Sequence, residues 1–127
     1  MYICVDFDGT MVDHCFPGIG EPAPNSVRVC KRLIECGHLL ILWTMRSDGQ
    51  ESGDVLSEAV EWMNSYGIGL HGINCNPDQA SWTESPKAYG HIYVDDAAIG
   101  CPLIKPKGFH RPCVDWSAVE KIIFPTD

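Results

Sequence analysis

The sequence predicts an α/β protein with a Rossmann-like, three-layer fold, in which helices cover a central parallel sheet of about five strands. Strand-like and helix-like segments alternate along the chain, the order that gives parallel sheets. The apolar run at residues 38–44 (HLLILWT) has the composition of a strand buried on both faces. The length of 127 residues fits a single domain spanning 1–127.

The first half of the chain predicts two strands and one helix. Residues 2–7 (YICVDF) form a short apolar run that stops at an Asp-Gly turn, as a strand end does. Residues 9–23 are rich in Gly and Pro and predict an irregular loop. A helix is expected from Asn25 or Ser26, either of which can cap it, to about Cys36. The buried strand described above follows it.

The second half repeats the pattern. Helical spacing of apolar residues covers 51–66, and a weaker strand is expected at 68–74. The run HIYV at 91–94 predicts a fourth strand, and 101–104 a short fifth one. Residues 116–124 predict a closing helix.

Composition and charge exclude several classes of protein. The net charge is −8 and no basic stripe is present, which argues against nucleic-acid binding. No apolar run approaches the roughly 20 residues that span a bilayer, and no secretory signal follows Met1. The seven cysteines are odd in number and form no C-x-x-C pair, so we expect free thiols in a reducing compartment and no structural zinc site. A cytoplasmic location is expected.

Polar side chains stand at the ends of the predicted strands. Asp6 and Asp8 flank the end of the first strand, Thr44 ends the second, and Asp95 and Asp96 end the fourth. Ligands of parallel sheets bind outside the carboxyl ends of the strands, so these residues are expected in one crevice. Several carboxylates at such short range need a cation, and oxygen ligands favour Mg²⁺.

The same residues resemble the motifs of a known enzyme family. The segment DFDGT at residues 6–10, placed after an apolar strand, resembles the first motif of the haloacid dehalogenase superfamily of phosphohydrolases. Thr44 is similar to its second motif, Lys87 to its third, and Asp95 with Asp96 to its fourth. The resemblance covers the whole chain, with all four motifs in order.

The resemblance implies a Mg²⁺-dependent phosphatase that works through an aspartyl-phosphate intermediate. Asp6 would be the nucleophile and Asp8 the general acid and base. Thr44 would hydrogen-bond the phosphoryl oxygens, and Lys87 would offset the negative charge that gathers on Asp6 and the phosphoryl group. An acidic residue at position 8 favours phosphatase or phosphomutase chemistry over dehalogenase or ion-pump chemistry.

The resemblance also implies the metal and phosphate ligands. Asp6, Asp95 and the main-chain carbonyl of Asp8 would hold the metal, with Asp96 bound directly or through water. Arg46 could reach a substrate phosphate or, equally, pair with a neighbouring carboxylate. The candidate phosphate-binding residues are Gly9, Thr10, Met45 and Arg46.

Members that act on small metabolites usually carry a cap domain, and this chain has no room for one. The site is therefore expected to be open, which implies a bulky substrate or a cap from a neighbouring subunit of a homo-oligomer. Residues 14–22 are a candidate flap, with Phe16 and Ile19 exposed unless something covers them. An open site argues against phosphomutase chemistry, which must exclude water. The partner is a phosphorylated small molecule or an exposed phosphate on a larger one; the sequence does not name it.

Two other interpretations stay open. Response-regulator receiver domains have a similar size and a similar set of acidic residues around Mg²⁺, but their phosphorylated Asp ends the third strand, where this chain has GINCNPD at 72–78. A catalytically inactive binding module on the same fold is the other alternative.

Overall fold

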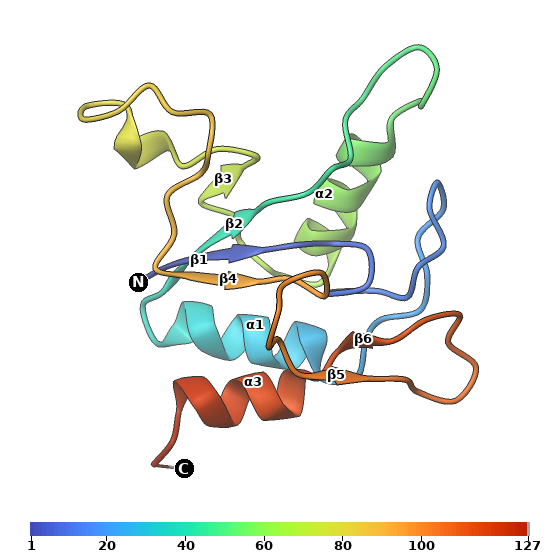
Figure 1. Ribbon diagram of the computed structural model, residues 1–127. Coiled ribbons are helices and arrows are strands. Elements are labelled where there is room, and N and C mark those ends of the chain that lie inside the picture. Colours follow the sequence, from blue (N-terminus) through green and yellow to red (C-terminus); the bar gives the residue numbers. More distant parts are fainter. Residues whose placement is uncertain (127) are drawn as a thin grey trace.

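The computed structural model describes residues 1–126 and shows an α/β fold built around a parallel sheet (Figure 1). The helices are α1 (Ser26–Glu35), α2 (Val55–Ser65), the 3-10 helix η1 (Pro77–Gln79) and α3 (Trp116–Ile123). The strands are β1 (Tyr2–Val5), β2 (Leu39–Leu42), β3 (Gly72–Ile73), β4 (Ile92–Val94), β5 (Leu103–Ile104) and β6 (Cys113–Val114).

The parallel sheet has four strands in the order β3-β2-β1-β4, one fewer than the five expected. Residues 101–104 were expected to supply the fifth, but β5 instead pairs antiparallel with β6, in a separate two-stranded sheet. Pro102 and Pro106 flank β5, and because proline has no N–H to donate, the segment cannot extend into a longer ladder.

The two faces of the sheet are covered differently. Ile3 and Val5 belong to the main core, which also contains buried residues of α1, α2 and α3. Cys4 and Ile41 point to the opposite face and pack against Ala88, from the segment that joins β3 to β4. The right-handed crossover rule explains why the two faces are covered by different segments. The chain adds β2 and then β3 on one side of β1 and returns to add β4 on the other side, so the connection to β4 covers the opposite face from α1 and α2.

Two helix starts differ from the expectation. Asn25 precedes α1 at φ 66° without a side-chain capping bond, and the Ser26 hydroxyl donates to the Met11 carbonyl instead. Helix α2 begins at Val55 rather than near residue 51, because the preceding loop is held by Asp48, whose carboxylate accepts the amide of Leu56.

Helix α3 packs against α1 through an ion-pair cluster. The Glu120 carboxylate accepts both Nη atoms of Arg28, at 2.8 and 3.0 Å, and Nη1 of Arg32 at 2.9 Å. Hydrogen bonds from Arg28 and then Arg32 lower the pKa of Glu120 to about 2. No helix in residues 1–126 is long and apolar enough to cross a membrane.

Candidate active site

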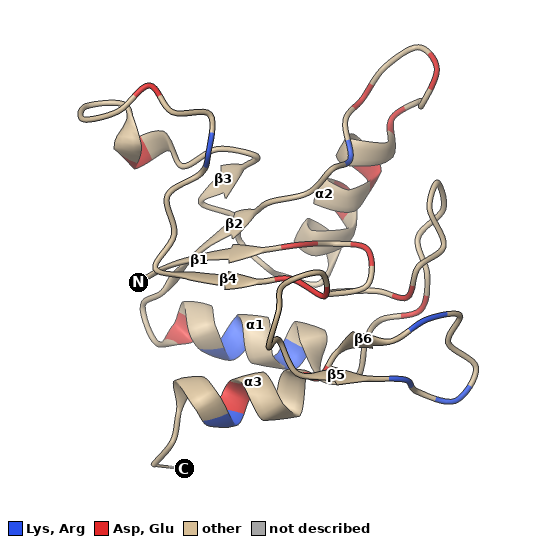
Figure 2. Cartoon of the chain, in the orientation of Figure 1, with Lys and Arg blue, Asp and Glu red and all other residues tan. Residues whose placement is uncertain are grey.

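Three carboxylates gather where β1 and β4 end. The Asp6 amide donates to the Val94 carbonyl at 3.0 Å, which holds the two strand ends together. One oxygen from each of Asp6, Asp95 and Asp96 lies within 4.8 Å of the other two. Figure 2 shows acidic residues at this edge of the sheet. The expected convergence of Asp6 with the Asp95-Asp96 pair is therefore present.

Three carboxylates at this range repel one another. Burial, followed by the charge of Asp95, raises the pKa of Asp6 to about 8. In the part of the chain that the structure describes, no Lys or Arg forms an ion pair with any of the three carboxylates. The donor set consists of oxygen alone, which suits Mg²⁺ and not the softer transition metals. Asp6, Asp95 and Asp96 therefore fit the metal that the sequence implies.

Thr10 lies beneath the carboxylates and holds them in place. Thr10 is fully buried, and its hydroxyl donates to Asp6 Oδ2 at 3.3 Å. The hydroxyl oxygen of Thr10 also accepts a hydrogen bond from the Asp96 amide at 3.3 Å. Its carbonyl accepts the indole Nε1 of Trp116 at 2.7 Å. The structure therefore gives Thr10 a positioning role among the carboxylates, whereas the sequence suggested phosphate binding.

His14 is a site residue that the sequence did not indicate. Its Nε2 lies 2.9 Å from Asp96 Oδ2, so the ring orients this carboxylate. Gly9 makes room for the pair: it has φ 79°, and a Cβ there would overlap the His14 ring and the Asp96 carboxylate. A lone histidine in an irregular loop carries no spacing signal, so only the fold reveals this contact.

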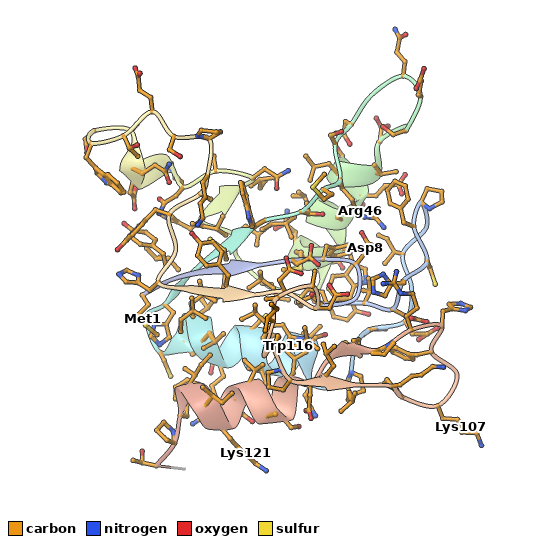
Figure 3. All side chains as sticks on the ribbon, viewed as in Figure 1. Met1, Asp8, Arg46, Lys107, Trp116 and Lys121 are labelled. Carbon is orange, nitrogen blue, oxygen red and sulfur yellow. The ribbon has the colours of Figure 1, made fainter. Side chains whose placement is uncertain are left out.

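Asp8 is held by a buried arginine (Figure 3). Arg46 donates Nε to Asp8 Oδ2 and Nη2 to Asp8 Oδ1, both at 2.8 Å. Its remaining N–H groups donate to the carbonyls of Gly18 at 2.7 Å, Val55 at 3.1 Å and Pro17 at 3.4 Å. All five guanidinium N–H groups are thus used, and the residue is 2% exposed. Of the two roles left open for Arg46, the structure shows carboxylate pairing.

The candidate flap is tied to this arginine. The ring of Phe16 lies 5.1 Å from the Arg46 guanidinium carbon and is 57% exposed. Ile19 is partly buried against the main core, so only one of the two apolar flap residues stands open to solvent.

A small cavity of about 190 Å³ opens beside the carboxylates. It is lined by Asp6, Trp43, Thr44, Met45 and Asp95. The Thr44 hydroxyl oxygen accepts a hydrogen bond from the Arg46 amide at 3.1 Å. Within residues 1–126 the Thr44 hydroxyl donates no hydrogen bond, so its proton is left to donate to a ligand. Met45 is almost fully exposed at the rim.

Asn74 is the second site residue that the sequence did not indicate. It adopts φ 53° after β3, and its side-chain oxygen accepts the Thr44 amide at 2.8 Å. Its side-chain nitrogen donates to the Arg46 carbonyl at 3.4 Å. Asn74 thereby fixes the loop that carries Thr44.

Lys87 lies over the Tyr93 ring and forms no ion pair with the three carboxylates among the described residues. Its Nζ is 5.2 Å from the centre of the Tyr93 ring. Tyr93 pairs with Cys4, and Asp6 follows Cys4 by two residues, so all of these side chains share one face of the sheet. Among the described residues Lys87 forms no ion pair with Asp6. The predicted contact between Lys87 and Asp6 is therefore not formed in this structure.

A solved structure is similar to the whole of this chain. It is that of the conserved protein coded by locus from Bacteroides thetaiotaomicron, which is 33% identical, with a TM-score of 0.77. The match covers 100% of this chain and 92% of that one. The chain belongs to the same family as this protein. No protein-family model matches the chain, and no curated protein does.

The similarity to the Bacteroides thetaiotaomicron protein includes the loops after β1, β2 and β4, since the whole chain is covered. The carboxylate cluster therefore lies within the matched part of the chain.

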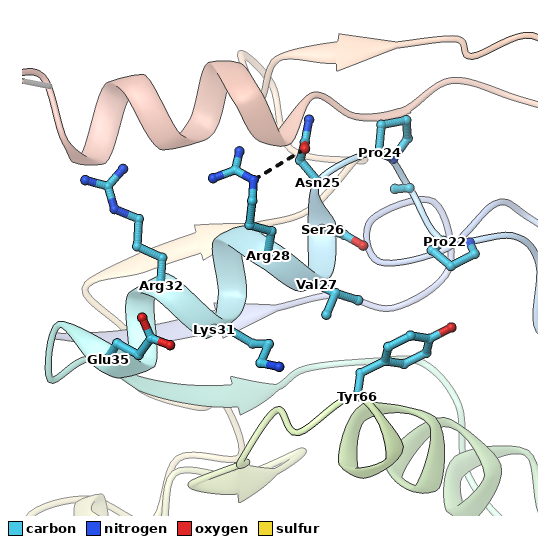
Figure 4. A pocket seen from close by; sticks show the side chains of 11 residues that line it. Pro22, Pro24, Asn25, Ser26, Val27, Arg28, Lys31, Arg32, Glu35 and Tyr66 are labelled. Carbon is cyan, nitrogen blue, oxygen red and sulfur yellow. Dashed lines mark hydrogen bonds between the residues drawn. The ribbon is translucent and has the colours of Figure 1, made fainter.

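A larger hollow lies elsewhere, along α1 (Figure 4). Its volume is about 810 Å³, and its lining includes Arg28, Lys31 and Tyr66 but none of the three carboxylates. Arg28 is engaged by Glu120 there, as described above. This hollow is therefore separate from the carboxylate cluster.

Proposed function

We propose that this chain is a Mg²⁺-dependent phosphohydrolase that cleaves a phosphate monoester through an aspartyl-phosphate intermediate. The observation that carries the proposal is the cluster of Asp6, Asp95 and Asp96, two members of which, Asp6 and Asp95, line a small cavity together with Thr44. Phosphoryl transfer requires mainly positioning and charge neutralisation, and these residues are suited to both.

The first half-reaction uses Asp6 and Asp8. An Asp6 carboxylate oxygen attacks phosphorus, the bond from phosphorus to the leaving oxygen breaks, and Asp8 gives its proton to that oxygen. The free proton of the Thr44 hydroxyl hydrogen-bonds a phosphoryl oxygen, and Lys87 moves from the Tyr93 ring towards the charge on Asp6. Bound Mg²⁺ would neutralise the negative charge shared by the carboxylates and the phosphoryl group.

The second half-reaction returns the protein to its starting state. Asp8 takes a proton from a water molecule, the water oxygen attacks phosphorus, and the bond to Asp6 breaks, releasing inorganic phosphate. Arg46 donates to both oxygens of the Asp8 carboxylate and so fixes its orientation for this half-reaction, in which the ionised group accepts the water proton. Arg46 is thus a positioning residue in this mechanism.

The cavity limits what the site encloses. A volume of about 190 Å³ accommodates a phosphoryl group, while the leaving group extends over the rim at Met45 and Trp43. The proposed substrates are therefore monoesters whose phosphate is freely accessible.

The test is hydrolysis of an aryl phosphate by the purified chain, with and without Mg²⁺. We expect metal-dependent turnover by the natural chain. Turnover should fall at least about a thousandfold in Asp6→Asn, since this change removes the nucleophile, and it should also be lost in Asp8→Asn. Glu51→Gln, which changes an exposed carboxylate that does not line the cavity, is the matched control and should keep full activity.

Two outcomes would contradict the proposal. One is turnover that persists in Asp6→Asn. The other is absence of turnover in the natural chain with Mg²⁺ while beryllofluoride still binds stably at Asp6, which would favour a receiver-like or binding module.

A further inference from the structure

A second group of metal-binding side chains lies outside the carboxylate cluster. Asp13 and Cys15 belong to the loop after β1, and His110 belongs to the loop between β5 and β6. One ligand atom from each lies within 4.8 Å of the other two. The two loops lie side by side at one end of the molecule (Figure 1).

Asp13 is the fixed member of the group. It is 4% exposed, and its Oδ1 accepts the amide of His14 at 2.8 Å. The amide of His110 donates to both carboxylate oxygens, at 3.0 and 3.2 Å. Within residues 1–126 no Lys or Arg pairs with Asp13, so this buried negative charge has no full cationic partner.

The other two members can adjust around Asp13. His110 Nε2 lies 4.0 Å from Asp13 Oδ2, and its side chain is 68% exposed, so the ring is free to turn. Cys15 is partly buried and carries a free thiol. A carboxylate, a thiol and an imidazole thus face one point from two loops.

We propose that Asp13, Cys15 and His110 bind a zinc-class divalent cation, a site that the cysteine spacing did not predict. An oxygen, a sulfur and a nitrogen donor form a set that Zn²⁺ accepts, whereas Mg²⁺ and Ca²⁺ require oxygen. Binding releases the thiol proton of Cys15 to solvent and leaves the fourth tetrahedral position for water. The set differs from the Asp6 cluster in donor type, so the two sites select different metals.

The location of the site gives it a structural effect. The loop that carries Asp13 and Cys15 continues into Pro17 and Gly18, whose carbonyls accept Arg46. A metal bound here would link this loop to the β5–β6 loop through side chains, in addition to the existing hydrogen bonds between Asp13 and the His110 amide. Zinc binding therefore stabilises the flap, whether or not the proposed hydrolysis occurs.

The experiment is titration of the reduced full chain with Co²⁺, followed by displacement with Zn²⁺. Cobalt bound by a thiolate gives a near-ultraviolet charge-transfer band, which the carboxylate cluster cannot produce. We expect this band in the natural chain and its loss in Cys15→Ser. Zinc affinity, measured by competition with a chromophoric zinc indicator, should fall at least about tenfold in both Cys15→Ser and His110→Ala.

Controls separate this site from the other thiols and from the Asp6 cluster. Cys36→Ser changes an exposed cysteine on another part of the surface and should keep the band. Zinc should raise the Tm of the natural chain and not that of Cys15→Ser, while the metal-free Tm of the two chains stays equal. A band that persists in Cys15→Ser, or zinc binding lost only in Asp6→Asn, would overturn the proposal.

Discussion

Replacing Arg46 with Met tests how the Asp8 carboxylate is held. The change leaves Asp8 without its partner and frees the carbonyls of Pro17, Gly18 and Val55. Removing one member of a buried ion pair costs about 3–5 kcal/mol. The Asp8 side chain is 19% exposed and recovers some hydration, so we expect a loss of about 3 kcal/mol, at the lower end of that range.

The expected loss is large for a domain of this size. Against a typical stability of about 5–15 kcal/mol, it should lower the Tm by about 10 °C. Urea unfolding followed by tryptophan fluorescence measures the free energy directly. Arg46→Lys keeps the positive charge but not the bidentate contact with Asp8. It should therefore restore less than half of the unfolding free energy that Arg46→Met loses.

A double-mutant cycle provides the decisive comparison. Asp8→Asn, Arg46→Met and the double variant should show a coupling energy of about 2 kcal/mol if the pair acts as a unit. A loss of less than about 1 kcal/mol in Arg46→Met, or strictly additive effects, would refute the reasoning.

Three further predictions address the carboxylates and the two helices of the main core. Asp6→Asn should raise the Tm of the metal-free chain, because it removes one of three mutually repelling carboxylates, and should abolish stabilisation by Mg²⁺; a thermal-shift assay with and without the metal checks both. Glu120→Gln should lower the Tm at pH 7. Because the folded pKa of about 2 lies below the ordinary 4.5, this difference should shrink as the pH falls from about 4.5 towards 2, and a constant difference would contradict it. Trp116→Phe leaves the buried Thr10 carbonyl without its donor and should cost about 1–3 kcal/mol, measured by urea unfolding; an unchanged midpoint would show that the bond contributes nothing.

Much of the fold could be predicted because it depends on local patterns. The apolar runs at β1, β2 and β4 and the helical spacing of α1 are properties of short segments. Sheet topology then brings the strand ends together, which is why Asp6 and the Asp95-Asp96 pair were found from sequence.

What could not be predicted depends on contacts between distant loops. His14 orients Asp96, and Asp13 meets His110, through pairings with no regular spacing. The partner of β5 was missed for the same reason, since a two-residue strand flanked by prolines looks alike whether it joins the main sheet or a hairpin. The choice of partner for Arg46 likewise depended on a buried geometry that composition does not encode.

The hydrogen bond between Trp116 and Thr10 has a consequence for biosynthesis. It spans 106 residues, and its carbonyl belongs to the turn that supports Asp6 and Asp96. The ribosome makes β1 and the turn at Thr10 well before α3, and domains complete their native contacts only when their sequence has emerged. A growing chain therefore cannot close the hydrogen bond between Trp116 and Thr10 until α3 has been made, long after Asp6 has been synthesised.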